Sequence, residues 1–322
     1  MLGTSRGGMG PGVMKARLDQ VKGLTARPFG VNFVASPSHV NGDQVRPELD
    51  LDCVSIAAHA ASVVEFFYGS PDPRLVEIVH AGGAFACWQV GSVEEAVQAE
   101  AAGCNLIVAQ GIEAGGHVRG KMALPKLVAE ILQAVRIPVL AAGGIGTADD
   151  VTAALKMGAD GVRAGTRFLA ATEADVNPEY VAALIGAVAE NTVYTMKFHV
   201  GFPDASHRVL RSCIAAAESF EGEVVGHSMR MDGTHGQVRR FCHHDTPYRD
   251  HRHHLGNAAV GRAICGCFFA RPARCGDRGR TDSCDLKVKL LHLNWAILTF
   301  ERPDRPAPTR ASALHGPELA AG

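Results

Sequence analysis

The chain has 322 residues, a hydrophobic composition of 47% and a formal net charge of −1, so it is long enough to bury a sizeable core. A charge near zero gives no electrostatic reason to expect nucleic acid, an acidic partner or a membrane surface. No segment resembles a secretory signal or a membrane span, and the nine cysteines lack the spacing of a disulfide framework. These features favour a cytoplasmic globular protein with reduced thiols that acts on a small molecule.

Short β-branched or aromatic runs alternate with amphipathic segments from residue 29 to about 170. Ser92 and Thr147 are suited to begin helices as N-caps, and Gly103 and Gly158 are suited to end them. The predicted helical segments are 13–26, 71–83, 92–103, 123–136 and 147–158. The predicted strands are 29–35, 62–69, 84–91, 105–111, 138–144 and 161–169.

Apolar strands separated by single helices predict a parallel sheet with right-handed crossovers. An open doubly wound sheet would have its glycine-rich cofactor loop after the first strand, whereas here such loops follow later strands. The pattern therefore favours an α/β fold of the TIM (β/α)8 type. Residues 1–3 could end a seventh strand, and an eighth is absent from the front, so we expect an incomplete barrel that lacks its first strand.

The composition changes near residue 240, which divides the predicted barrel domain, 1–240, from an irregular tail, 241–322. This tail is rich in Arg, His, Cys and Pro and contains five of the nine cysteines. Paired zinc ligands at a regular spacing are missing, so we expect no metal site. The alternatives are a poorly ordered tail with a weak helix near 286–298, or translation out of frame in a high-GC gene, which we favour.

Two glycine-rich strand ends suit a phosphate group. Gly143, Gly144 and Gly146 leave backbone N–H groups uncovered just before a helix N-terminus, where the helix dipole favours an anion. Gly165 and Thr166 offer a further N–H group and a hydroxyl. Each loop alone could be only a tight turn, but the same feature on the last two strands is typical of the phosphate site of a barrel.

His117 is the candidate catalytic base. It follows Gly115 and Gly116 just beyond a strand end, on the rim expected to carry the phosphate loops, and imidazole accepts a proton near neutral pH. The roles of its polar neighbours stay open. Gln110 could bind a cofactor ring or cap the strand, Glu113 could be a solvated loop acid, and Asn32 could face the rim or stabilise a turn.

These motifs in this order resemble the nitronate monooxygenase family, formerly called 2-nitropropane dioxygenases, which are FMN enzymes with a TIM-barrel domain. The resemblance covers roughly residues 1–235. It is carried by "RPFGVNF", "VVEFFYG", "AQGIEAGGH", "PVLAAGGI" and "GADGVRAGTRF". It implies that His117 is the catalytic base, that Gly143, Gly144, Gly165 and Thr166 bind the FMN phosphate, and that Asn32 and Gln110 approach the flavin ring. Gly115 and Gly116 complete the implied cofactor site.

The implied reaction begins when the α-proton of a nitroalkane passes to His117 and leaves a nitronate. FMN and O2 then convert the nitronate to a carbonyl compound and nitrite. Two alternatives remain open. One is an FMN- and NAD(P)H-dependent reductase of the enoyl-acyl-carrier-protein type, which has similar glycine loops. The other is an inactive fragment, because the family's first strand and its C-terminal pattern have no match in this chain.

Overall fold

The computed structural model describes residues 2–3, 10–35, 49–171, 174, 178–198, 206–229, 235–241 and 296–299. Its main element is an eight-stranded sheet in which the first seven strands are parallel and follow the chain order. These strands are β1 (Leu2–Gly3), β2 (Gly30–Val34), β3 (Val63–Phe67), β4 (Phe85–Val90), β5 (Leu106–Gln110), β7 (Val139–Ala142) and β8 (Gly161–Ala164). The TIM-type prediction is confirmed, including the strand end at residues 1–3.

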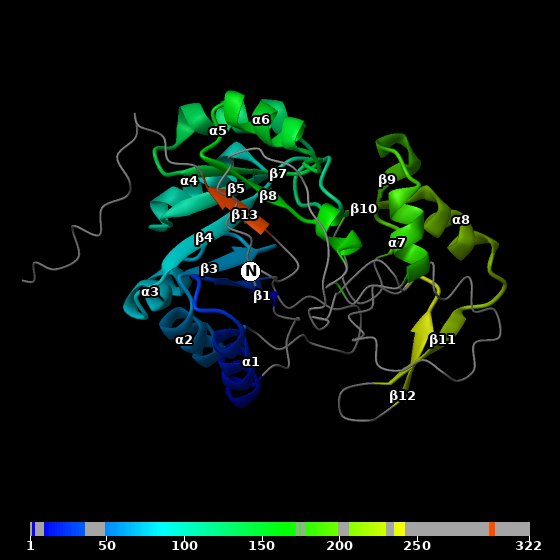
Figure 1. The fold of residues 1–322 in the computed structure, drawn as a ribbon, viewed down its shortest axis with the longest axis horizontal. Coiled ribbons are helices and arrows are strands. Elements are labelled where there is room, and N and C mark those ends of the chain that lie inside the picture. The colour runs from blue at the N-terminus through cyan, green and yellow to red at the C-terminus, as the bar shows by residue number, and fades with distance from the viewer. Residues whose placement is uncertain are drawn as a thin grey trace, which may run out of the picture.

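Six helices connect the parallel strands and cover the outer face of the sheet (Figure 1). They are α1 (Pro11–Leu24), α2 (Leu51–Ala60), α3 (Pro73–Ala81), α4 (Val93–Ala101), α5 (Leu124–Ala134) and α6 (Ala148–Lys156). The predicted N-caps are confirmed, because Ser92 accepts from the amide of Glu95 and Thr147 forms a capping box with Asp150. Gly103 and Gly158 have positive φ angles, as expected of residues that end a helix.

Strand residues alternate between two environments. One set, which includes Val64, Trp88 and Ile107, packs against the helices in the main core. The other set faces the inside of the curled sheet, where Val108 and Leu140 form a small separate cluster with their neighbours. Because successive side chains of a strand point to opposite faces, the residues between the helix-facing positions project into the interior.

A second packed unit follows the barrel strands. It comprises η1 (Thr166–Ala170), α7 (Pro178–Ile185), η2 (Ala189–Asn191), β9 (Thr192–Thr195), β10 (His207–Leu210), α8 (Arg211–Ser219), β11 (Val224–Met229) and β12 (His235–Arg239). Most of its elements lie to one side of the sheet (Figure 1) and share an apolar core around Phe198, Leu210 and Ile214. β10 also pairs with β6 (Gly116–His117), a short strand that follows β5. The second unit is therefore joined to the segment that contains His117.

The eighth strand of the sheet, β13 (Ala296–Thr299), pairs antiparallel with β8. This corrects the expectation of an irregular tail or the end of a weak helix for these four residues. The physical reason is that the edge of β8 offers unpaired backbone groups, which a short apolar segment can satisfy. The proposed domain boundary at residue 240 stays a prediction. Residues 242–295 lie outside the described part of the chain, and they include most of the tail in which we expect no metal site. No helix in the described part is both long and apolar enough to cross a bilayer.

Candidate active site

The residues predicted from the glycine loops lie together at one edge of the sheet, where the carboxyl ends of the parallel strands meet. A Cβ atom added to Gly115 would lie 2.4 Å from Oγ1 of Thr166. A Cβ atom added to Gly143 would lie 3.0 Å from the backbone nitrogen of Ala114. The segment that leads to His117 therefore packs against the loops that follow β7 and β8.

The imidazole of His117 lies between two other rings. Its centroid is 5.6 Å from that of Tyr68 and 5.5 Å from that of His207, and both pairs meet edge to face. His117 is half-buried, and its Nε2 atom is shielded from solvent. Packing on two sides restricts the rotation of the imidazole, which suits a base that must point at one substrate atom.

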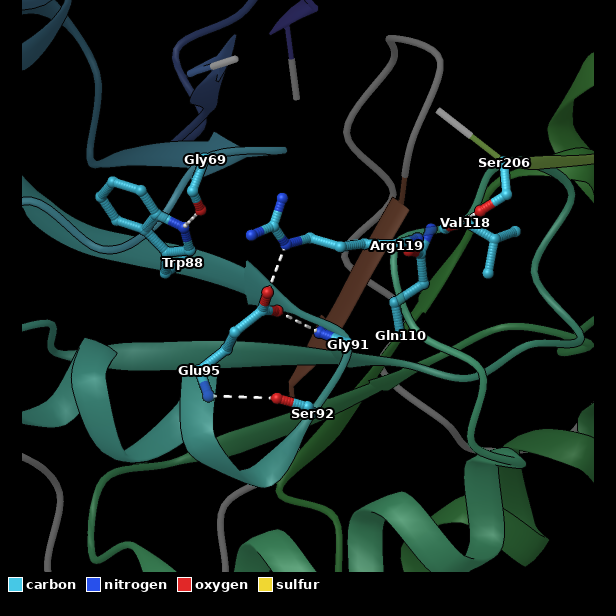
Figure 2. Close-up of polar contacts among 9 residues, drawn as sticks. All are labelled: Gly69, Trp88, Gly91, Ser92, Glu95, Gln110, Val118, Arg119 and Ser206. Carbon is cyan, nitrogen blue, oxygen red and sulfur yellow. Dashed lines mark hydrogen bonds and ion pairs between the residues drawn. The ribbon is translucent and has the colours of Figure 1, made fainter. Parts of the chain in front are cut away.

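The backbone around His117 is fixed from two parts of the chain. Nε2 of Gln110 donates to the carbonyl of His117 at 2.8 Å, and Oε1 of Gln110 accepts from the amide of Arg119 at 3.2 Å. From β10's side, the amide of Val118 donates to the carbonyl of Ser206 at 2.9 Å, and the hydroxyl of Ser206 donates to the carbonyl of Val118 at 2.8 Å. Figure 2 shows Gln110 and Ser206 beside this segment. Both polar groups of the Gln110 side chain are bonded to the backbone of this segment, and its expected approach to the flavin ring stays a prediction.

Arg119 connects this segment to the end of β4. Its Nε donates to Glu95, and the other carboxylate oxygen of Glu95 accepts from the amide of Gly91 at 2.8 Å (Figure 2). The Arg119 guanidinium also lies 5.8 Å from the ring centroid of Tyr68. The backbones of Gly91 and Gly120 are also closely packed, because a Cβ atom on Gly91 would lie 2.4 Å from the backbone nitrogen of Gly120. The loop after His117 is thus fixed against β4 as well as β5.

Gly143 and Gly144 have φ angles of 115° and 68°, a region that other residues rarely adopt. Their amides donate no hydrogen bond within the described part of the chain. Gly146 behaves differently, because its amide donates to Oδ2 of Asp150 at 3.0 Å. The expectation that Gly146 leaves its N–H group uncovered is therefore wrong: the carboxylate of Asp150 already occupies that end of α6.

Asn32 takes part in a buried polar network inside the curled sheet. Its Nδ2 donates to Oε1 of Glu65 at 2.6 Å, and the same carboxylate pairs with Arg163 of β8. Arg163 also donates to Oε1 of Gln89 at 2.5 Å. The structure shows no turn contact for the Asn32 side chain in the described part of the chain, and its expected place facing the rim stays a prediction. The side-chain amide instead satisfies a buried carboxylate, which would otherwise be strongly destabilising.

Three features of the site were missed from the sequence. His207 is brought to His117 by the pairing of β10 with β6, which leaves no periodic signal because the strands are distant in the chain. Tyr68 has a φ angle of 75°, a strained conformation for an aromatic residue; the "YG" pair at a strand end was a possible signal. Glu113 accepts from the amide of Leu124 and so caps α5, although it was considered a solvated loop acid.

The buried cysteines near the sheet are not suited to nucleophilic chemistry. Burial raises the pKa of the Cys104 thiol to about 12, and burial followed by the nearby Glu65 raises the pKa of Cys87 well above its usual value. A raised pKa keeps both groups as thiols near neutral pH, whereas the thiolate is the reactive form. Neither cysteine is therefore a candidate nucleophile of the site.

A TIM-type barrel whose glycine loops and candidate base, His117, lie at the carboxyl edge of its strands has the arrangement of a barrel enzyme. The nitronate monooxygenase family model matches residues 2–227, and the chain belongs to this family of flavin-dependent oxidoreductases. The nitronate monooxygenase of Paraburkholderia phytofirmans is 37% identical over 145 residues, which are 42% of this chain and 39% of that protein.

Two solved structures are also similar. Nitroalkane oxidase from Streptomyces ansochromogenes has a TM-score of 0.56 and 29% identity, and the match covers 62% of this chain and 66% of that chain. FabK from Thermotoga maritima has a TM-score of 0.54 and 31% identity, with coverages of 64% and 61%. The chain spans 39%, 40% and 62% of the length of three curated relatives that it matches.

Proposed function

We propose that this protein oxidises nitronates and nitroalkanes with FMN and O2, and that the products are a carbonyl compound and nitrite. The observation that carries the proposal is the position of His117: its segment packs directly against the two glycine loops at the carboxyl edge of the sheet. A base and a phosphate-binding surface on one rim suit an enzyme that deprotonates its substrate beside a bound cofactor. A cytoplasmic location is part of the same proposal.

The residues of the rim fit the phosphate of FMN. Gly143 and Gly144 present backbone amides from a left-handed turn, and a Cβ atom on Gly144 would lie 3.2 Å from Cβ of Glu113, so a larger residue would narrow the turn. Gly165 and the exposed Thr166 begin the next loop, and Oγ1 of Thr166 lies against Gly115 of the segment that leads to His117. We assign the phosphate to these four residues. Gly115 and Gly116 let the neighbouring backbone pass closely, and we infer that the flavin ring lies toward His117.

The chain's own contribution is to orient the substrate and accept its proton. A neutral imidazole at His117 takes the α-proton of the nitroalkane, and the two flanking rings and the Gln110 bond keep it in one orientation. Gln110 and Asn32 act behind the rim in this scheme, because their side-chain amides are bonded to His117 and Glu65. Bound FMN would supply the electron acceptor and the reactivity toward O2 that side chains lack.

The test compares two substrates of one reaction. The purified protein should be yellow, contain FMN, and release nitrite from both a neutral nitroalkane and its preformed nitronate. His117→Ala should lose activity on the neutral nitroalkane by about a hundredfold or more, the usual contribution of a general base, and should keep activity on the nitronate. His59→Ala, on the exposed surface of α2, is the matched control.

Three outcomes would contradict the proposal. Rapid reduction of the flavin by NADH without nitronate turnover would assign the protein to the reductase alternative. A colourless, unfolded product would assign it to the inactive fragment. Full activity of His117→Ala on the neutral nitroalkane would show that another group is the base.

A further inference from the structure

His207 is a buried titratable residue whose own protonation has no role in the proposed reaction. Its side chain is fully buried, with a relative exposure of 0%, and its Nε2 atom is shielded from solvent. The centroid of its ring lies 5.5 Å from that of His117 and 5.8 Å from that of Phe198. A histidine in such a position can influence its neighbour through packing and through charge.

The position of His207 is fixed by its strand. In the three-stranded sheet β6-β10-β9, His207 is the register partner of His117 on one side and of Thr195 on the other. The adjacent Ser206 accepts a hydrogen bond from the hydroxyl of Tyr194 at 2.6 Å and itself donates to Val118. Arg208 donates to the carbonyl of Ile112 at 2.9 Å. The two imidazoles therefore have little freedom to move apart.

The charged groups around His117 and His207 disfavour the protonation of both imidazoles at once. Besides His207, the ring of His117 faces Tyr68, which follows β3. The guanidinium of Arg119 lies 5.8 Å from the ring centroid of that tyrosine and is paired with Glu95 from α4. The guanidinium of Arg208 is on the same strand as His207. Two imidazolium ions 5.5 Å apart in a poorly solvated place would repel each other strongly.

We propose that His207 is a positioning residue that keeps His117 neutral, because the two imidazoles together take up at most one proton in the working pH range. The catalytic consequence rests on the proposed function of His117. Repulsion from a second titrating site can only lower the protonation of the first at a given pH, whichever ring protonates first. His207 thus extends the activity of the base toward lower pH.

The experiment replaces the titrating ring by one that does not titrate. In the full chain, kcat/KM for nitroethane is measured against pH for the native protein and for His207→Phe. The acid limb of the profile should move to higher pH by about one unit in the variant. Phenylalanine makes the surroundings of His117 more apolar, which alone would move the limb to lower pH. A shift to higher pH therefore reports the lost proton site and not the altered packing.

Matched measurements separate this effect from a structural one. Thr195→Val changes the other register partner of His207 and should leave the limb in place, and the profile for preformed ethyl nitronate should not respond to His207→Phe. His207→Gln serves as a second variant if the phenylalanine protein fails to fold. Active variants with an unmoved acid limb, or with a limb moved to lower pH, would overturn the inference.

A second measurement does not depend on turnover. The protonation of His117 can be followed by NMR in protein with 15N-labelled histidine, with its signals assigned from His117→Ala. In His207→Phe, His117 should protonate at higher pH than in the native chain. If the native protein oxidises neither substrate, the proposed function fails, and this titration still decides whether the two imidazoles share one proton.

Discussion

Gln110 and His117 are joined by a hydrogen bond of 2.8 Å from the side-chain amide of Gln110 to the carbonyl of His117. The same side chain accepts from the amide of Arg119, so one residue at the end of β5 fixes both sides of the proposed base. Its two polar groups are used by the backbone, and its exposure is 4%. The orientation of His117 therefore depends on Gln110 through the backbone.

Replacing Gln110 by Leu should affect both stability and catalysis. The change leaves a carbonyl and an amide without their partner in a mostly buried place, which we expect to lower the free energy of unfolding by about 2 kcal/mol. It should also lower kcat for a neutral nitroalkane roughly tenfold, because the base loses its fixed orientation. Urea denaturation and nitrite release measure the two effects. Gln98→Leu, on the exposed face of α4, is the control, and equal behaviour of the two variants would contradict the assignment.

The glycine turn after β7 allows a sharp comparison. Gly144 has a φ angle of 68°, and a methyl group added to it would lie 3.2 Å from Cβ of Glu113. A methyl group added to Gly146 would have no atom within 4 Å. Gly144→Ala should therefore destabilise the fold by about 1 kcal/mol and weaken FMN retention. Gly146→Ala should do neither. Thermal unfolding and flavin content after gel filtration distinguish them, and tight FMN binding by Gly144→Ala would argue against a phosphate site at this turn.

Asp150 gives a prediction with a defined pH dependence. The amide of Gly146, followed by the hydroxyl of Thr147, lowers the pKa of the Asp150 carboxyl below its usual value of 3.8. The ionised form is favoured in the folded state, so its stabilisation is present above about pH 4 and is lost as the pH falls through the lowered pKa. Asp150→Ala should lower the free energy of unfolding by about 1 kcal/mol at pH 7, and the difference should shrink at pH 2.5.

Asp149→Ala is the control for Asp150, because it removes a charge from the same first turn of α6 without removing the capping box. Urea denaturation at both pH values measures the difference. If Asp149→Ala lost as much stability as Asp150→Ala, the effect would belong to the helix dipole and not to the cap.

The barrel framework was predictable because its signals are local. Strand runs, N-caps such as Thr147 and stop glycines such as Gly158 depend on neighbours within a few residues, and the structure confirms them. The closeness of Gly115 and Thr166 also followed, because the carboxyl ends of parallel strands share one edge. The predicted order of the parallel strands was therefore enough to predict that these two loops are neighbours in the folded protein.

The partners of individual side chains were not predictable. Asn32 binds Glu65, and Glu65 binds Arg163 from a strand 98 residues away, so no local pattern reveals the network. Likewise β10 pairs with β6 through only two register positions, too few for an alternating pattern in the sequence. Hydrogen bonds, ion pairs and strand pairings between residues that are far apart in the chain can be recognised only in the folded structure.

The Glu65–Arg163 pair tests how the interior of the sheet is stabilised. Both side chains are almost fully buried, with exposures of 0% and 2%. Glu65→Leu should lower the free energy of unfolding by about 3–5 kcal/mol, because the charge of Arg163 is left without its partner in a medium of low polarity. The double variant Glu65→Leu with Arg163→Met should be more stable than Glu65→Leu alone, since it removes the unpaired charge and restores apolar volume.

An exposed pair supplies the comparison. Lys15 and Asp19 form an ion pair of 2.9 Å on α1, and their side chains are 70% and 57% exposed. Lys15→Ala should change the free energy of unfolding by less than about 1 kcal/mol, because water screens the attraction. Urea denaturation followed by circular dichroism measures all three variants. A double variant less stable than Glu65→Leu would mean that Arg163 stabilises the interior through Gln89 and its packing, even without its carboxylate partner.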